Sequence, residues 1–259
     1  MGQRPPGPSR RAAWPPPIRG INDESFTPFP VERRREENRD TPVRACHPVP
    51  AAYEDAWAAL CWAVSSCCTA AGSGPGTEEP WLSIHGDVAR LFVAGDSAGA
   101  NIAHNMALRS GGGGGLPGGA RIEGMVLLHP YFRGEELVPS EGTDPTFLEK
   151  AERSWGFLSG GRYGLDHPSI NPLAMPPEEW AKLGCRRALV TVAERDTLRD
   201  RGRRYVEALR GSGWDGEEVV LYETEGEGHV YFIDKSGGGG DEKAKKEMAT
   251  VVSFIRQHD

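Results

Sequence analysis

A serine flanked by glycines constrains the fold of this chain more than any other feature. Residues 95–99 read Gly-Asp-Ser-Ala-Gly, and residues 91–94 before them form an apolar run with the length of a buried strand. After the motif, Ile102, Met106 and Leu108 are spaced for one face of a helix. A serine at a sharp turn from strand to helix is a nucleophile elbow. The sequence therefore predicts a strand, an exposed Ser97 and a helix in immediate succession.

The residues around Ser97 have expected roles in this turn. We expect side chains at Gly95 and Gly99 to collide with the neighbouring strand and helix, so that both positions require glycine. Asp96 completes the elbow between the strand and the serine. The N–H of Ala98 opens the helix, where free N–H groups and the helix dipole stabilise negative charge. Ala98 is thus the predicted oxyanion donor.

Three further apolar runs have the length of buried strands and alternate with helical patterns. The predicted strands cover residues 122–129, 188–193 and 218–224, and the predicted helices cover residues 147–158, 198–209 and 242–257. Another helix is predicted from Pro50 to beyond Val64. Short apolar strands that alternate with helices indicate a mostly parallel sheet with helices on both faces. The predicted fold class is therefore α/β.

A serine hydroxyl becomes an effective nucleophile when a base accepts its proton and a carboxylate orients that base. In elbow folds the acid and then the histidine follow the serine along the chain. Asp196 lies just beyond the third predicted strand and is preferred as the acid over Glu194, and over Asp200, which is expected on a solvated helix face. His229 lies in a glycine-flanked loop after the last predicted strand and is the predicted base.

No metal or cofactor site is predicted. The five cysteines show no C-x-x-C spacing, which is typical of free thiols in a reducing compartment. Cys61 and Cys68 lie seven residues apart on a predicted helix, and we expect both in the core. The remaining histidines are expected in structural or surface positions: His47, His85 in a loop, His104 on the elbow helix, His129 at a strand end, His167 and His258.

Composition divides the chain into two parts. Residues 1–45 are rich in proline and charge and are predicted to be irregular or disordered, whereas residues 46–259 carry all the strand and helix patterns. The net charge of −7 provides no basic footprint for nucleic acid or an anionic membrane. The sequence has neither an 18-residue apolar run nor a secretory signal. We therefore expect a cytoplasmic protein without nucleic-acid or membrane partners.

Five short sequence motifs follow one another along the chain. They are residues 48–57 (PVPAAYEDAW), 95–104 (GDSAGANIAH), 129–132 (HPYF), 171–173 (NPL) and 228–232 (GHVYF). Together they resemble the plant carboxylesterases of the hormone-sensitive-lipase-like group, over residues 46–259. The resemblance implies an α/β-hydrolase fold and hydrolysis of a small-molecule ester through an acyl-serine intermediate. It also implies a triad of Ser97, Asp196 and His229 without a cofactor, and it leaves the oligomeric state open.

One family feature is missing. Members of the family carry a His-Gly-Gly loop upstream of the serine, whose backbone N–H groups complete the oxyanion hole. No His-Gly-Gly occurs between Met1 and Asp96. We therefore expect residues 46–259 to form a partial α/β-hydrolase domain without the N-terminal strands of the sheet. Because one lost oxyanion donor costs about 10²–10³ in rate, we also expect impaired activity. An incomplete gene product and a real short isoform both remain open.

Three other functions stay open beside ester hydrolysis. Gibberellin receptors use the same fold as small-molecule binding modules, although they replace the catalytic histidine that is present here as His229. Some relatives are lyases that remove water from hydroxyisoflavanones, and nothing in residues 131–184 distinguishes acyl transfer from elimination. The missing oxyanion loop also makes an inactive truncated product a serious alternative.

Overall fold

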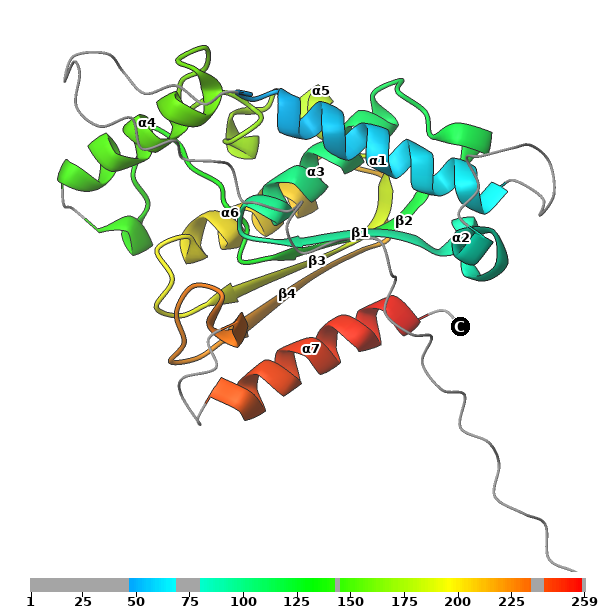
Figure 1. Ribbon diagram of the computed structural model, residues 1–259. Helices are drawn as coiled ribbons and strands as arrows, with labels where there is room; N and C mark the ends of the chain where they lie inside the picture. The colour runs from blue at the N-terminus through cyan, green and yellow to red at the C-terminus, as the bar shows by residue number, and fades with distance from the viewer. Residues whose placement is uncertain (1–46, 69–79, 143–144, 234–239, 258–259) are drawn as a thin grey trace, which may run out of the picture. The chain divides into compact units, whose positions relative to one another are not determined.

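The sheet consists of four parallel strands in the order in which they occur along the chain. The computed structural model describes residues 47–68, 80–142, 145–233 and 240–257. Its strands are β1 (Leu91–Asp96), β2 (Ile122–Leu128), β3 (Cys185–Ala193) and β4 (Glu218–Thr224), and they pair as β1-β2-β3-β4 (Figure 1). The four predicted strands and the α/β fold class are confirmed. The predicted irregular segment, residues 1–45, lies outside the described residues.

All three strand pairs are parallel, so their carboxyl ends lie at one edge of the sheet. Asp96 of β1 is level with Leu128 of β2, and Leu128 is level with Thr191 of β3. The last pair of β3 and β4 is Ala193 with Thr224. The loops that leave these ends therefore converge, and ligand sites of open α/β sheets lie at this edge.

The described part of the chain contains seven α-helices. They are α1 (Ala51–Cys68), α2 (Pro80–His85), α3 (Ala98–Gly111), α4 (Pro145–Ser159), α5 (Pro177–Trp180), α6 (Arg199–Gly211) and α7 (Gly240–Arg256). The predicted helices are confirmed within a few residues at each end. His85, expected in a loop, is instead the last residue of α2. None of the described helices is both long and apolar enough to cross a membrane.

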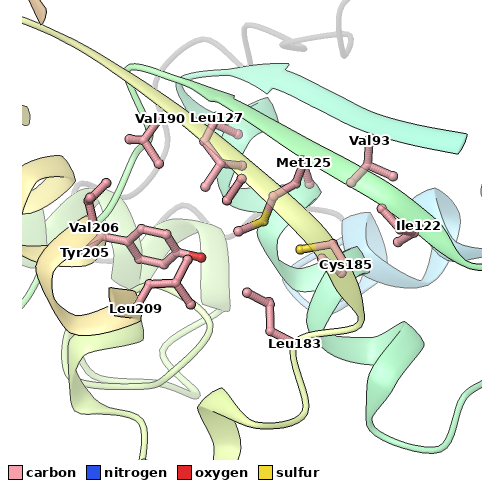
Figure 2. Close-up of a cluster of buried hydrophobic side chains, with 14 of the residues drawn as sticks. Val93, Ile122, Met125, Leu127, Leu183, Cys185, Val190, Tyr205, Val206 and Leu209 are labelled. Atoms are coloured by element: carbon pink, nitrogen blue, oxygen red, sulfur yellow. The ribbon is translucent and has the colours of Figure 1, made fainter. Parts of the chain in front are cut away.

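One face of the sheet carries the larger hydrophobic core. Side chains of α3 and α6 pack there against alternate residues of the strands, with α1 outside them. Figure 2 shows Tyr205, Val206 and Leu209 of α6 directed at this cluster, to which the sheet contributes Leu127 and Val190. These side chains are almost fully buried. The position of α3, and with it the turn that starts α3, is therefore fixed by packing.

The opposite face is covered by α7 alone among the described helices (Figure 1). Phe254 is buried against Val126 of β2 and Leu189 of β3, and its ring meets Phe92 of β1 edge-on. Helices therefore cover both faces, as predicted. Since α7 lies beneath the strands that carry the convergent loops, its buried face reaches the underside of those loops.

Strand β1 forms one margin of the sheet, and no strand precedes it in residues 47–68 or 80–90. Apolar side chains are also exposed on α2, which packs against α1: Trp81 is 57% and Ile84 is 66% accessible. Exposed apolar side chains of this size, and the free edge of β1, both favour association with other chains. Of the two cysteines expected in the core, Cys61 packs partly against it, whereas the expectation for Cys68 was wrong because that thiol is exposed at the end of α1.

A buried ion pair ties the loop after β2 to α6. Arg201 of α6 donates to both carboxylate oxygens of Glu141, at 2.8 and 2.9 Å, and to the Gly134 carbonyl at 3.2 Å. The neighbouring Asp200 was predicted on a solvated face, which is wrong. It is 9% exposed, pairs with Arg199 at 2.8 Å and accepts a hydrogen bond from the Ser140 N–H at 2.9 Å.

Replacing Glu141 with glutamine is expected to cost about 3 kcal/mol in the free energy of unfolding at pH 7, because it leaves a buried guanidinium without its charge partner. Burial acts to raise the pKa of Glu141, but hydrogen bonds from Arg201, Val138 and Arg133 outweigh it and the pKa is lowered. A lowered pKa stabilises the fold above the unfolded value, about 4.3, and this contribution disappears as the pH falls through the folded value.

The difference between wild type and Glu141→Gln should therefore shrink on acidification below about pH 4. Urea unfolding of both proteins at neutral and acid pH measures it. A difference that is constant with pH would show that the charge of Glu141 is not what stabilises this loop.

Candidate active site

The predicted elbow is present as a strained turn. Ser97 stands between the last residue of β1 and the first residue of α3, with φ 52° and ψ −115°. Its N–H donates to the Leu128 carbonyl at 2.9 Å, and its carbonyl accepts from the Tyr131 N–H at 3.0 Å. Non-glycine residues adopt such backbone angles only where surrounding structure enforces them, and such strain clusters at active sites.

The two glycines of the motif differ in what they contact. A Cβ built on Gly95 would lie 2.3 Å from the Gly99 carbonyl carbon and 2.8 Å from the Ala100 nitrogen, so no side chain fits. A Cβ on Gly99 would meet nothing within 4 Å. The expected collision at Gly99 is therefore wrong, because it is the backbone of Gly99 that approaches Gly95, while its own Cβ direction is open.

Because of this difference, we expect alanine at Gly95 and alanine at Gly99 to change the free energy of unfolding by different amounts. Gly95→Ala forces a methyl group against backbone atoms that cannot rotate away, and we expect a loss of about 3 kcal/mol in the free energy of unfolding. Gly99→Ala, its matched control in the first turn of α3, is expected within about 1 kcal/mol of wild type. Thermal and urea unfolding compare them. Equal destabilisation of the two variants would contradict the close approach.

The structure brings Ser97, His229 and Asp196 together. The His229 Nε2 lies 2.8 Å from the Ser97 Oγ, and its Nδ1 lies 2.7 Å from the Asp196 Oδ2. The other oxygen of Asp196 accepts from the Leu198 N–H at 2.9 Å. The Asp196 side chain is 2% exposed and that of His229 is 34% exposed. An ionised carboxylate can only accept, so it holds the proton on Nδ1 and leaves Nε2 free to accept the serine proton.

The rival acids lie elsewhere. Glu194 uses its carboxylate to accept a hydrogen bond from the Gly226 N–H in the His229 loop. Asp200 is engaged with Arg199 and with the Ser140 backbone. Neither contacts the His229 ring in the described structure. Of these three carboxylates, Asp196 is therefore the one that contacts His229.

Of the other histidines, His104 is structural. It is fully buried, burial lowers its pKa to about 3, and its Nδ1 lies 3.0 Å from the Tyr205 hydroxyl. His129 is different, because it lies directly behind the site. Its Nδ1 accepts from the Val230 N–H at 2.8 Å, and its Nε2 lies 3.4 Å from Glu247 of α7.

Sequence reasoning missed this second layer of polar groups. Around Glu247 it includes Thr224, whose hydroxyl donates at 3.1 Å, and Tyr231, whose hydroxyl donates at 2.8 Å. One signal was available for His129: it directly follows β2, at the sheet edge where Ser97 and Asp196 also lie. No comparable signal marks Glu247, which looks like one more charged residue of a terminal helix.

His129, Asp196 and His229 could together offer a metal ion three ligand atoms, which lie within 4.8 Å of one another. Each of these atoms already has a hydrogen-bonding role. The Nδ1 of His229 and the Oδ2 of Asp196 bond each other, and the Nδ1 of His129 accepts from Val230. Binding a metal would require these bonds to break, so the arrangement fits proton transfer better than metal coordination.

Negative charge can be stabilised at the start of α3. Ala98 is the first residue of that helix, and the first N–H groups of a helix have no carbonyl partner within it. Together with the helix dipole they attract an anion beside the Ser97 side chain. A hydroxyl, an imidazole, a buried carboxylate and the start of a helix thus meet at one sheet edge, and these groups have the chemistry that acyl transfer requires.

Comparison with known proteins identifies the family of the chain. A family model described as alpha/beta hydrolase fold matches residues 45–233. The 2-hydroxyisoflavanone dehydratase of Glycyrrhiza echinata is 45% identical over 210 residues, covering 81% of this chain and 62% of that protein. The chloroplastic tuliposide A-converting enzyme 1 of Tulipa gesneriana is 42% identical, with 81% and 50% covered. Probable carboxylesterase 13 of Arabidopsis thaliana is 38% identical, with 81% and 63% covered.

Solved esterase structures share the fold. A thermostable esterase from Pseudomonas putida superimposes with a TM-score of 0.61 at 22% identity, covering 82% of this chain and 60% of that one. The esterase of Pyrobaculum calidifontis superimposes with a TM-score of 0.58 at 25% identity, covering 80% of this chain and 62% of that one.

The chain spans between 50% and 63% of the length of the dehydratase, the tuliposide-converting enzyme and the carboxylesterase relative. The rest of each relative has no counterpart in the alignment.

Proposed function

Since the chain belongs to the alpha/beta hydrolase fold family, we propose that it is a serine carboxylesterase that cleaves small-molecule esters through an acyl-serine intermediate. Ser97 is the nucleophile, His229 the general base and acid, and Asp196 the residue that orients His229. The backbone N–H of Ala98 stabilises the oxyanion. No metal or cofactor takes part in the proposed reaction. The plant carboxylesterase relative supports the reaction class.

The proposed reaction proceeds in two halves. As the Ser97 Oγ attacks the ester carbonyl, its proton moves to the Nε2 of His229, and the carbonyl oxygen becomes an oxyanion beside Ala98. Collapse of the tetrahedral intermediate breaks the bond to the alcohol, which leaves with the proton from His229. Water then attacks the acyl-serine by the same route and releases the acid and free Ser97. Asp196 stabilises the imidazolium in both halves without itself gaining a proton.

One observation carries this proposal: the unbroken hydrogen-bond chain from Ser97 through His229 to Asp196, with links of 2.8 and 2.7 Å. A fluorophosphonate tests it, since this reagent phosphonylates only an activated serine. We expect mass spectrometry to find the label on the peptide that contains Ser97 in folded protein and to find none after heat denaturation. Absence of label from folded protein would refute the proposal.

We further propose that the activity is impaired. In the resembled family a His-Gly-Gly loop upstream of the serine supplies further oxyanion donors beside the residue that corresponds to Ala98, and this sequence contains no His-Gly-Gly before Ser97. One missing donor costs about 10²–10³ in rate. The measurement is hydrolysis of a p-nitrophenyl acetate series by this chain beside a plant carboxylesterase that carries His-Gly-Gly. Equal values of kcat would show that no donor is lacking. An inactive product would instead show neither turnover nor labelling.

A second candidate reaction is favoured by the dehydratase relative. In that case His229 would remove a proton from a 2-hydroxyisoflavanone and water would leave, without any covalent bond to Ser97. Incubation with a 2-hydroxyisoflavanone, followed by mass analysis of the product, distinguishes the two reactions. Loss of water by a variant without the Ser97 hydroxyl would favour elimination, and hydrolysis of esters that depends on Ser97 favours the esterase.

The organisation and location of the chain are also proposals. We propose that residues 46–259 act as one domain preceded by an irregular segment, which limited proteolysis tests by cleavage confined to the first 45 residues. We propose a cytoplasmic location, although the tuliposide-converting relatives are named as chloroplastic or amyloplastic proteins. Cell imaging of a fluorescent fusion distinguishes the compartments.

A further inference from the structure

The residue that follows His229 is held by a buried side chain. Val230 has φ 45°, which a β-branched residue rarely adopts, and its N–H donates to the Nδ1 of His129 at 2.8 Å. The nearest alternative partner of this Nδ1, the Asp196 Oδ2, is 3.8 Å away, beyond hydrogen-bond distance. Since an N–H needs an acceptor, the Nδ1 of His129 carries no proton.

The other nitrogen of His129 faces a buried carboxylate. Its Nε2 lies 3.4 Å from the Oε1 of Glu247, and both side chains are fully buried. No other hydrogen-bond partner is found for either atom in the described residues. Burial acts to raise the pKa of Glu247, but the polar groups of His129, Thr191 and Tyr231 that face it outweigh burial and the pKa is lowered. A carboxylate only accepts hydrogen bonds, so it selects the tautomer of His129 with the proton on Nε2.

We infer that His129, held by Glu247 as its Nε2–H tautomer, is a positioning residue that keeps the backbone after His229 in place. The inference rests on the proposed function, because it concerns how the base of that reaction is aligned. The opposite tautomer would point an Nδ1–H at the Val230 N–H, two donors facing each other, and the loop would shift. A misplacement of 1 Å in a reacting group costs about 10²-fold in rate.

The pair also connects two parts of the molecule. Glu247 belongs to α7, which covers the opposite face of the sheet from α3 and α6, whereas His129 stands at the end of β2. The ring of His129 packs against the rings of His229, at 5.9 Å, and Phe232, at 5.3 Å. The position of the loop after His229 therefore depends on how α7 packs, through the Glu247 carboxylate and the His129 imidazole.

The tautomer can be read directly, without any measurement of activity. Long-range ¹H–¹⁵N spectra of protein labelled in its histidine rings distinguish the two nitrogens, and the His129→Asn spectrum assigns the signal. We expect Nε2 protonated and Nδ1 unprotonated in wild type. Glu247→Met should give a mixture of tautomers, whereas Glu247→Gln should retain the wild-type form, because its amide oxygen can still accept from Nε2. A protonated Nδ1 in wild type would overturn the inference.

Rates of phosphonylation at Ser97 test the consequence. We expect Glu247→Met to react about tenfold more slowly, and Glu247→Gln within about threefold of wild type. Tyr231→Phe is the matched control: it removes another hydrogen bond to Glu247, at 2.8 Å, but keeps the ring that packs against His129, and should react within about twofold of wild type. Equal slowing by Tyr231→Phe and Glu247→Met would mean general loosening of the fold and would overturn the positioning role.

Two further variants and one further measurement apply if Glu247→Met does not fold or if wild type is not labelled. If Glu247→Met does not fold, His129→Asn and His129→Ala replace it: asparagine tolerates the positive φ of 46° and restores an acceptor for the Val230 N–H, so only alanine should slow phosphonylation. If wild type is not labelled at all, the proposed function fails. The positioning role is then judged on the far-downfield Nδ1 proton of His229, which should weaken in Glu247→Met and persist in Tyr231→Phe.

Discussion

Ser97→Ala is expected to reduce ester hydrolysis to the uncatalysed background, a fall of about 10⁴-fold or more where wild-type turnover permits the measurement. The physical reason is that the Oγ, 2.8 Å from the Nε2 of His229, is the atom that forms the acyl bond in the proposed reaction. Release of p-nitrophenol from p-nitrophenyl acetate, corrected for spontaneous hydrolysis, measures the effect. The fluorophosphonate label should vanish as well.

The substitution should leave the fold unchanged, which is its control. The backbone bonds that hold Ser97, to Leu128 and Tyr131, do not involve the hydroxyl. We therefore expect the melting temperature to match that of wild type within a few degrees, since surface-accessible Ser-to-Ala changes cost little. Retained hydrolysis in correctly folded Ser97→Ala would mean that another group is the nucleophile, and the proposed acyl-serine route would fail.

Asp196→Asn is expected to lower kcat by about 10⁴-fold while the protein remains folded. The asparagine oxygen can still accept from the Leu198 N–H, which leaves the amide NH₂ facing the Nδ1 of His229. The ring must then accept at Nδ1 and carry its proton on Nε2. In that tautomer Nε2 points a proton at Ser97 and cannot act as a base.

Glu194→Gln is the matched control for this prediction. It makes the same change from carboxylate to amide in a neighbouring acid, whose contact is with the Gly226 N–H rather than with His229. We expect its kcat within about threefold of wild type. Should Glu194→Gln be the variant that loses activity while Asp196→Asn keeps it, the acid of the site would be Glu194.

Much of this molecule was predictable because the signals are local. The apolar runs that became β2, β3 and β4 needed no partner to be recognised, and the glycine-flanked serine needed only the strand before it and the helix after it. The order of acid and histidine along the chain then selected Asp196 and His229. Their mutual geometry is consistent with those choices, with links of 2.7 and 2.8 Å.

Other features could not be read from local pattern. Gly99 looked as constrained as Gly95, because sequence does not say in which direction a Cβ would point. Asp200 was expected on a solvated face, but in the structure it pairs with Arg199 and accepts a hydrogen bond from the Ser140 N–H. His129 and Glu247 are 118 positions apart, as their numbers give, and each alone is an ordinary residue.

The sequence by itself determined the strands, the elbow and the identities of the candidate nucleophile, base and acid, because each depends on residue type and spacing within a short segment. Only the tertiary structure decided which glycine is sterically obligatory and which buried pair lies behind the loop after His229. Those outcomes depend on distances between side chains from different elements, and such distances are set when β2, β3 and α7 pack together.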